Sequence, residues 1–254
     1  MCMSEKKECW VVDCGEMEYL ASLELQKKLV TLRSKGVIPD VLLLLEHPPV
    51  ITMGLKATES MLRIPKRILE QRGIPVYNVS RGGKVTFHGP GQVIGYAIRA
   101  IPLEQLDNHM NGLEDTMLRT LSDYKVDARK SYIVDSNKRL PGAWTFHNKK
   151  ECKLGSVGVE VRTGVTMHGF ALNVNIALDQ FDLIDMCGFK DKYAISMRKI
   201  LDKPLLMSEV KTKLASSFAD VFSYRVEKKS FLSFMDAVNK SLRAIPPEKE
   251  NVRY

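Results

Sequence analysis

The sequence predicts a single α+β domain in which a mainly antiparallel, mixed sheet is flanked by helices. The chain has 254 residues and is 44% hydrophobic, which is enough for one substantial core. Strand-like runs often follow one another across a turn rather than alternating strictly with helices, which is typical of α+β proteins. No internal repeat or linker interrupts the pattern.

In the first part of the chain, apolar residues at helical spacing predict a helix from Glu16 to Lys35, which Gly36 ends. The apolar run Val41 to Leu45 predicts a buried strand, with Val50 to Met53 as its antiparallel return. Pro65 to Gln71 predicts a short helix.

The same patterns continue to the end of the chain. We expect further extended segments at Val76 to Val79, Val93 to Ile98, Ile133 to Val134, Ala143 to Phe146, Lys153 to Arg162 and Gly169 to Asn175. We expect further helices at Leu106 to Tyr124, Leu206 to Phe222 and Phe231 to Leu242.

Composition argues against a disordered protein and against a membrane-spanning one. The charged fraction of 27% and ordinary hydrophobicity argue against disorder, and no apolar run approaches the roughly 20 residues of a membrane span. The formal charge of +8 predicts attraction to something anionic, whether nucleic acid, a membrane surface or an acidic protein. Aromatic residues are not interleaved with the lysines, which argues against nucleic acid.

Cysteine usage indicates a reducing compartment. The cysteines are odd in number and form no C-x-x-C pair, so neither a disulfide framework nor a zinc site is indicated. They are Cys2, Cys9, Cys14, Cys152 and Cys187. The first residues lack the apolar centre of a secretory peptide, and we expect no removable leader.

The run RGGKVTFHGPGQ, at 81–92, is the most unusual segment of the chain. Its glycines permit a tight turn between two strands, and they also permit a loop that closes over a substrate. It matches neither the P-loop nor the dinucleotide-binding pattern, so a phosphate cradle is not indicated.

Two further segments carry groups suited to acyl transfer. Lys153 opens the small-residue run KLGSVGVEVRTGVTMHGFALNVN; such a lysine is ordinarily on the surface, but held away from water its amine suits proton transfer. Cys187, in DMCGF, is either a small buried hydrophobe or a nucleophile, and the nearby Lys190, Lys192 and Arg198 favour its thiolate.

Together, these three segments and Ser196 resemble the signature blocks of the lipoyl(octanoyl) transferases, in the biotin/lipoate protein ligase superfamily. The resemblance runs from about Trp10 to about Phe222 and implies the biotin/lipoate protein ligase-like fold. We therefore expect a catalytic domain at 10–224, followed at 225–254 by a C-terminal helix and a loose tail.

The resemblance implies transfer of an octanoyl group from acyl carrier protein to a cysteine thiol, and then to a lysine of a lipoyl domain. By motif match Cys187 is the nucleophile and Lys153 the acid and base. No cofactor and no metal are implied. The resemblance also implies a substrate-binding set made of Arg81, Gly82, Gly83, His88, Gly89, Ser156, Val157, Gly158, His168, Gly169 and Ala171.

The chain departs from the family pattern beside the proposed nucleophile. Met186 stands where proline is usual and Ile195 where threonine is usual. Elsewhere Ala97 replaces a frequent proline and Glu160 a frequent arginine. The segment from Thr145 to Cys152 is slightly long, which would place extra lysines beside the entrance to the site.

Two other functions stay open from the sequence. One is an ATP-dependent lipoate–protein ligase, which would need no thiol, and the other is an inactive module that binds lipoyl domains or carrier protein. The expected partners are octanoyl-acyl carrier protein, the lipoyl domains of 2-oxoacid dehydrogenase complexes and the glycine cleavage H protein. We expect a monomer that binds neither nucleic acid nor membrane. The preferred compartment is a prokaryotic cytoplasm; in a eukaryote we expect a mitochondrion or plastid.

Overall fold

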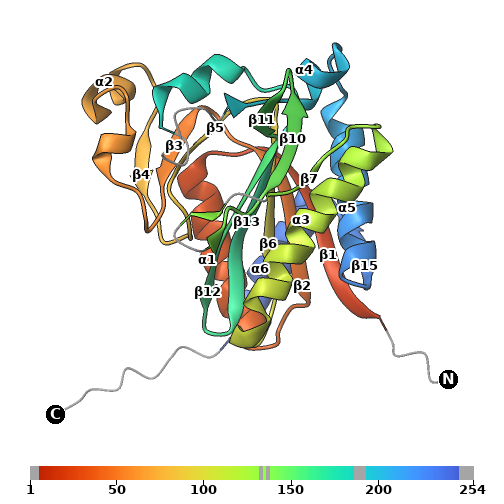
Figure 1. Ribbon diagram of the computed structural model, residues 1–254. Coiled ribbons are helices and arrows are strands. Elements are labelled where there is room, and N and C mark those ends of the chain that lie inside the picture. Colours follow the sequence, from red (N-terminus) through yellow and green to blue (C-terminus); the bar gives the residue numbers. More distant parts are fainter. Residues whose placement is uncertain (1–5, 132–133, 136–137, 186–192, 246–254) are drawn as a thin grey trace.

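A six-stranded mixed sheet forms the centre of the structure, a computed structural model that describes residues 6–131, 134–135, 138–185 and 193–245 (Figure 1). Its strand order is β12-β13-β6-β2-β1-β15. The strands from β12 to β2 pair antiparallel, whereas β2, β1 and β15 pair parallel. The bounds are β1 (Lys7–Glu16), β2 (Asp40–Glu46), β6 (Gln92–Ile98), β12 (Gly155–Arg162), β13 (Val165–Asn173) and β15 (Tyr224–Lys229).

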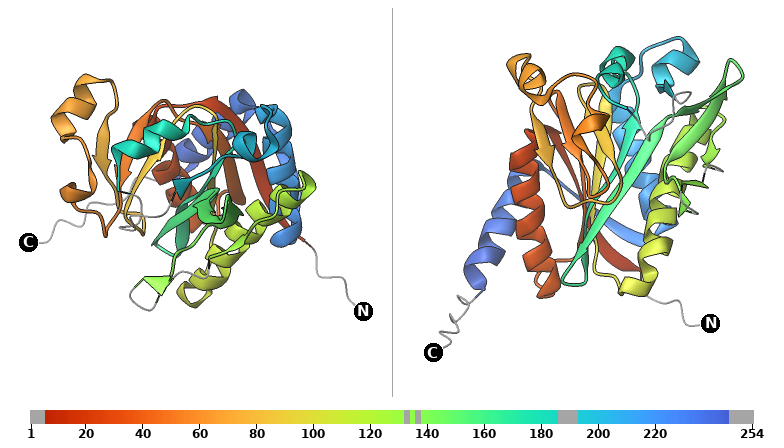
Figure 2. Two further views of the ribbon diagram at one scale, coloured as in Figure 1. Left: turned by 45° about the horizontal axis from the view of Figure 1, so that its top comes forward. Right: turned by 60° about the vertical axis from the view of Figure 1, so that its left-hand side comes forward.

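Helices cover both faces of this sheet (Figure 2). One face packs on α3 (Leu106–Asp123) and α5 (Met207–Val221), and the other on α1 (Tyr19–Ser34) and α6 (Phe231–Ala244). The predicted α+β class, with a mainly antiparallel mixed sheet between helices, is confirmed. Within the described ranges, no helix is both long and apolar enough to cross a bilayer.

The continuous apolar run of β2 follows from this three-layer arrangement. Leu42 and Leu44 belong to the core under α3 and α5, whereas Val41 and Leu43 belong to the core under α1 and α6. Alternate side chains of a strand point to opposite faces, so a strand covered on both sides needs an apolar residue at every position.

A separate three-stranded sheet, in the order β4-β3-β5, carries the glycine-rich segment. Its strands are β3 (Val50–Met53), β4 (Val76–Asn78) and β5 (Val85–His88). Three short helices contribute residues to the same hydrophobic cluster as these strands: α2 (Lys66–Gln71), η1 (Glu59–Met61) and η3 (Leu178–Leu183). The prediction that Val50–Met53 pairs with the preceding strand is wrong. Both edges of β2 are taken, by β1 and β6, so β3 pairs elsewhere.

Lys153 lies at a junction between sheets rather than inside one long strand. It ends β11, in a four-stranded sheet of order β14-β11-β10-β7, and β12 of the central sheet begins at Gly155. The bounds of the remaining elements are β7 (Arg129–Lys130), β8 (Val134–Asp135), β9 (Lys138–Arg139), β10 (Ala143–His147), β11 (Lys150–Lys153), β14 (Tyr193–Ala194), η2 (Leu103–Gln105) and α4 (Met197–Leu201).

Two strands of the central sheet, β1 and β15, are absent from the sequence prediction. They pair with each other in parallel, and β15 forms the edge of the sheet. The segment predicted as a C-terminal helix with a tail therefore begins with a strand. Its helix, α6, buries Phe234 and Val238 against the central sheet.

A buried carboxylate connects β15 to the rest of the domain. Asp40 accepts hydrogen bonds from Arg33 Nε at 2.6 Å and from the backbone N–H of Ala100 at 3.0 Å. The hydroxyl of Tyr224 also donates to Asp40, and Arg99 Nε donates to that hydroxyl at 2.7 Å. One side chain on β2 thus holds groups from α1, from the end of β6 and from β15.

We expect Asp40→Ala to lower the free energy of unfolding by about 3–5 kcal/mol, because it leaves buried partners without their acceptor. Asp123→Ala is the control, since its partner Lys213 and Asp123 itself are half-exposed, and such surface pairs contribute about 0–1 kcal/mol. Urea denaturation measures both. Equal shifts of the two midpoints would contradict the importance of the Asp40 cluster.

Candidate active site

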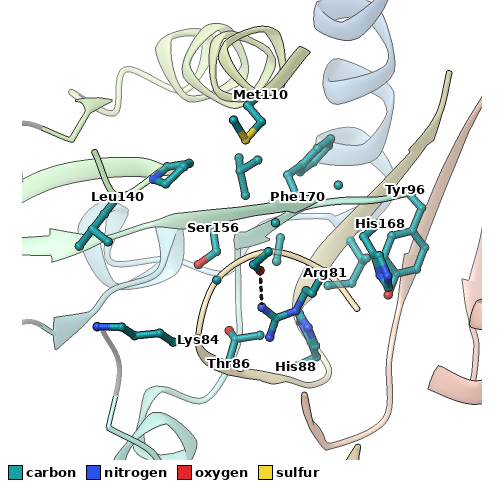
Figure 3. A pocket seen from close by; sticks show the side chains of 18 of the residues that line it. Arg81, Lys84, Thr86, His88, Tyr96, Met110, Leu140, Ser156, His168 and Phe170 are labelled. Carbon is teal, nitrogen blue, oxygen red and sulfur yellow. Dashed lines mark hydrogen bonds between the residues drawn. The ribbon is translucent and has the colours of Figure 1, made fainter. Parts of the chain in front are cut away.

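A cavity of about 740 Å³ lies where the glycine-rich segment meets β12, β13 and the start of α3. Figure 3 shows Arg81, Thr86 and His88 on one side of it, Met110 of α3 above, and Tyr96 beside His168. The lining residues are Tyr19, Lys56, Arg81, Gly82, Gly83, Lys84, Val85, Thr86, His88, Ile94, Tyr96, Leu106, Asp107, Met110, Asn111, Leu140, Pro141, Lys153, Ser156, Val157, Gly158, His168, Gly169, Phe170 and Ala171.

The cavity brings together most of the residues that the sequence singled out. Those that line it are Lys153, Arg81, Gly82, Gly83, His88, Ser156, Val157, Gly158, His168, Gly169 and Ala171. Gly89 is not among the lining residues, and a Cβ added there would lie 2.9 Å from the ring of Phe87. Cys187 and Met186 lie outside the described residues.

Arg81 is buried in the wall of the cavity, with neutral hydrogen-bond partners. Its NH2 group donates to the carbonyl and the hydroxyl of Thr52, both at 2.8 Å, and NH1 donates to the carbonyl of Gly82 at 3.0 Å. A buried cation is tolerated only when such acceptors surround it. The guanidinium therefore ties the glycine-rich segment to β3.

Glycines make the space that this guanidinium occupies. A Cβ at Gly54 would lie 2.7 Å from Arg81 NH1, and one at Gly158 would lie 3.3 Å from Arg81 Cδ. The backbone N–H of Gly82 donates to the carbonyl of Val159 at 3.0 Å, so the same segment is also bonded to β12. Gly54 and Gly158, both outside the glycine-rich segment, thus leave room for the arginine that this segment carries.

His168 is held in an unusual backbone conformation at the cavity. Its φ of 61° is in the left-handed region, and its backbone N–H donates to Gln26 Oε1 at 2.7 Å. The next residue, Gly169, has no room for a side chain, because a Cβ there would lie 2.1 Å from the carbonyl oxygen of Gly95. Among the described residues, Nε2 of the buried His168 ring has no hydrogen-bond partner, and Glu160 Oε2 lies 3.7 Å away.

The histidines around the cavity are neutral. Burial, and next the charge of Arg81, lowers the pKa of His168 to about 4. Burial, and next the neighbouring His47, lowers the pKa of His88 to about 3. These rings therefore act near neutral pH as hydrogen-bonding groups rather than as cations.

Tyr96 is a cavity residue that the sequence analysis missed, together with the His47 that holds it. His47 Nδ1 donates to the carbonyl of Met17 at 2.6 Å, so Nε2 accepts from the Tyr96 hydroxyl at 2.7 Å. Burial raises the pKa of Tyr96 well above its ordinary value. No sequence pattern distinguished Tyr96 from its apolar neighbours in β6.

Lys153 is positioned by both its backbone and its side chain. Its carbonyl accepts from the backbone N–H of Ile195 at 3.0 Å and from Asn173 Nδ2 at 3.4 Å. Its amine lies 5.1 Å from the centroid of the Trp144 ring, which is fully buried. Aromatic rings attract ammonium groups at this range, so Trp144 helps to hold the amine at the cavity.

The described residues on both sides of 186–192 are held by backbone hydrogen bonds to other parts of the chain. The backbone N–H of Asp185 donates to the carbonyl of Met61 at 2.7 Å, and Ala194 pairs with Lys153 where β14 joins β11. Ile195, one of the departures from the family pattern, packs in the central core. Across the described ranges, no cluster of His, Cys, Asp and Glu side chains could hold a metal ion.

The sequence matches a family model described as the lipoyl protein ligase A/B catalytic domain, over residues 18–219. The chain belongs to this family. It is 38% identical over 242 residues to an octanoyltransferase of Koribacter versatilis, which covers 94% of each chain. It is 39% identical over 222 residues to a mitochondrial octanoyltransferase of Arabidopsis thaliana, which covers 85% of this chain and 89% of the relative.

Solved structures agree on the fold. A lipoate-protein ligase A bound with ATP superimposes with a TM-score of 0.70 at 14% identity, and covers 94% of each chain. The resemblance of the three sequence blocks to the lipoyl(octanoyl) transferases is confirmed by the family match and by these relatives, as is the ligase-like fold. At this low identity the solved structure shows the fold alone.

We expect the protein to lose stability as the pH falls from about 6.5 toward 4. His47, His88, His109 and His168 have pKa values lowered to about 3 or 4, chiefly by burial. In this window the unfolded chain takes up protons that the folded chain excludes, so each histidine contributes up to about 1.4 kcal/mol per pH unit.

Urea midpoints measured between pH 4 and pH 8 check this expectation. His109→Gln removes one of the histidines that bind a proton only in the unfolded chain. The urea midpoint of this variant should therefore change less with pH, and the lining of the cavity stays the same. Stability that stays constant, or that rises on acidification, would contradict the neutral state of these rings.

Proposed function

We propose that this protein is an octanoyltransferase, which moves an octanoyl group from acyl carrier protein through a thioester on Cys187 to a lysine of a lipoyl domain. The observation that carries this proposal is that relatives named octanoyltransferase align over most of the chain. Lys153, the motif-matched acid and base, also lies at a cavity that most of the motif residues line.

In the first half-reaction the thiol of Cys187 gives its proton to the Lys153 amine, and the sulfur attacks the thioester carbonyl of the carrier. The new bond joins Cys187 sulfur to the acyl carbon, the bond to the carrier sulfur breaks, and Lys153 returns the proton to that sulfur. One thioester replaces another, so no ATP is consumed.

In the second half-reaction the amine of the acceptor lysine attacks the same acyl carbon. A C–N bond forms, the bond to Cys187 sulfur breaks, and Lys153 moves the proton from the amine to the departing thiolate. The order of steps is ping-pong, because the carrier leaves before the lipoyl domain arrives.

The volume and lining of the cavity support a medium-length acyl chain. Its volume of about 740 Å³ is in the range typical of small-molecule sites. Met110, Leu140, Val157, Phe170 and Ala171 supply apolar surface, and each buried CH₂ group of the chain contributes about 0.8 kcal/mol to binding.

The positive charge of the chain supports acidic protein substrates. A net charge of +8 increases the rate of encounter with anionic partners. We include acyl carrier protein, the lipoyl domains of 2-oxoacid dehydrogenase complexes and the glycine cleavage H protein among them. We propose a monomer that works in a prokaryotic cytoplasm or, in a eukaryote, in a mitochondrion or plastid.

We expect the protein to form an octanoyl adduct when it is mixed with octanoyl-loaded carrier protein without ATP. Intact mass spectrometry should show the adduct, hydroxylamine should remove it, and Cys187→Ser should not form it as a thioester. No adduct on a folded protein, together with ATP-dependent lipoylation, would identify a ligase instead. Tight binding of a lipoyl domain without any transfer would identify an inactive module.

We expect Lys153→Ala to remain folded and to lower the rate of octanoyl transfer by about 10²–10⁴-fold, as removal of an acid–base group does. Lys213→Ala is the matched control, because it changes the net charge equally but pairs with Asp123 on the surface. Single-turnover kinetics and circular dichroism measure both variants. Near-normal turnover of Lys153→Ala would contradict the assignment of Lys153 as the acid and base.

A further inference from the structure

A line of buried polar side chains runs from the cavity wall to the strand that carries Lys153. His88 Nδ1 lies 2.7 Å from Gln92 Oε1, and Gln92 Nε2 donates to Asn173 Oδ1 at 2.9 Å. Asn173 Nδ2 donates in turn to the carbonyls of Lys153, at 3.4 Å, and of Ile195, at 3.1 Å. His88 and the Lys153 strand are thus joined through two amides.

The backbone carbonyls of Lys153 and Ile195, where this line ends, determine which group donates in each of its hydrogen bonds. A backbone carbonyl can only accept, so Asn173 presents Nδ2 to Lys153 and Ile195, and presents Oδ1 to Gln92. Gln92 must then present Nε2 to Asn173, and the same Nε2 lies 3.4 Å from the carbonyl of Phe87. Gln92 Oε1 faces His88, and because an amide oxygen accepts only, His88 Nδ1 carries the hydrogen.

His88 therefore carries a hydrogen on Nδ1, and in the neutral ring the lone pair is on Nε2. Burial, and next the neighbouring His47, lowers the pKa of the ring to about 3, and Arg81 and His168 add to this effect. His88 lines the cavity, and its Nδ1 is occupied by Gln92. Nε2 is consequently the ring nitrogen that can accept a hydrogen bond from a group bound in the cavity.

We propose that Gln92 and Asn173 are positioning residues that keep His88 in the Nδ1–H tautomer, so that Nε2 accepts an N–H of the acceptor lysine. This inference rests on the proposed function. A neutral amine brings two N–H groups into the cavity, and Lys153 receives only one proton as the C–N bond forms. The other N–H needs an acceptor, because an unpaired donor in a buried site is costly.

The same reasoning separates the two half-reactions. A thiol has one S–H, and Lys153 accepts its proton, so formation of the Cys187 thioester does not need His88 as an acceptor. Loss of the His88 acceptor should slow transfer to the lipoyl domain and leave formation of the adduct nearly unchanged.

The tautomer is measured first, on the wild-type protein with ¹⁵N-labelled histidine, by long-range ¹H–¹⁵N correlation spectra at neutral pH. His88 should have a protonated Nδ1 and an unprotonated Nε2, and His88→Gln assigns its signals. His109 is an internal contrast of opposite tautomer, since Arg99 donates to its Nδ1 at 2.8 Å. An Nε2–H tautomer for His88 would overturn the proposal without any reference to catalysis.

The second measurement follows each half-reaction of Gln92→Met by rapid-quench mass spectrometry. Transfer from the octanoyl enzyme to a lipoyl domain should slow by about tenfold or more, while formation of the octanoyl enzyme changes less than about threefold. His88→Gln, which keeps an acceptor oxygen near the Nε2 position, should transfer faster than His88→Leu. Gln180→Met, the same substitution on η3, should behave as the wild type.

The outcomes are distinguishable. If the wild-type protein forms no octanoyl enzyme, the proposed function fails, and the spectra still report on the tautomer. If Gln92→Met transfers at the wild-type rate, or slows both half-reactions equally, Gln92 has no role in orienting His88 for the second step.

Discussion

The site depends on the hydrogen bonds of one buried group, the guanidinium of Arg81. Its hydrogen bonds to Thr52 hold the glycine-rich segment against the small sheet, while the Gly82 N–H bonds the same segment to β12 of the central sheet. A side chain at Gly54 would collide with this arginine and its loop, and one at Gly158 would contact them tightly. The glycine-rich segment thereby joins two sheets and forms a wall of the cavity. The charge of Arg81 adds to burial in lowering the pKa of His168.

A second constraint acts on the strand that carries Lys153. Lys153 lies where β11 ends and the central sheet begins, and Asn173 bridges its carbonyl to that of Ile195. The strand that presents the amine and the strand that follows residues 186–192 are thus fastened to β13 by one side chain. His88 joins this arrangement through Gln92, so hydrogen bonds connect the cavity residue His88 to the backbone of Lys153.

Sequence reasoning succeeded where a periodic pattern is long or where an apolar run is continuous. Helices α3 and α5 repeat apolar residues over several turns, and β2 is apolar on both faces because helices cover both. It failed for β1 and β15 at the parallel edge of the sheet: β1 does not alternate regularly, and β15 has only two apolar residues, Tyr224 and Val226, which is too short a pattern to predict a strand. It also paired β3 with β2, because closeness in sequence suggested a hairpin and nothing local revealed that both edges of β2 were occupied.

The sequence by itself determined the family and the fold class, and most of the site residues that it predicted line the cavity, because glycines, histidines and a lysine in three ordered blocks are specific as a set. It gave no sign of Thr52, Tyr96, Gln92 or Asn173 as partners of those residues. Hydrogen bonds between segments that are distant in the chain depend on which strands pair and in what register. Only the tertiary structure decided that pairing, and with it the direction of the bonds that orient His88 and hold Arg81.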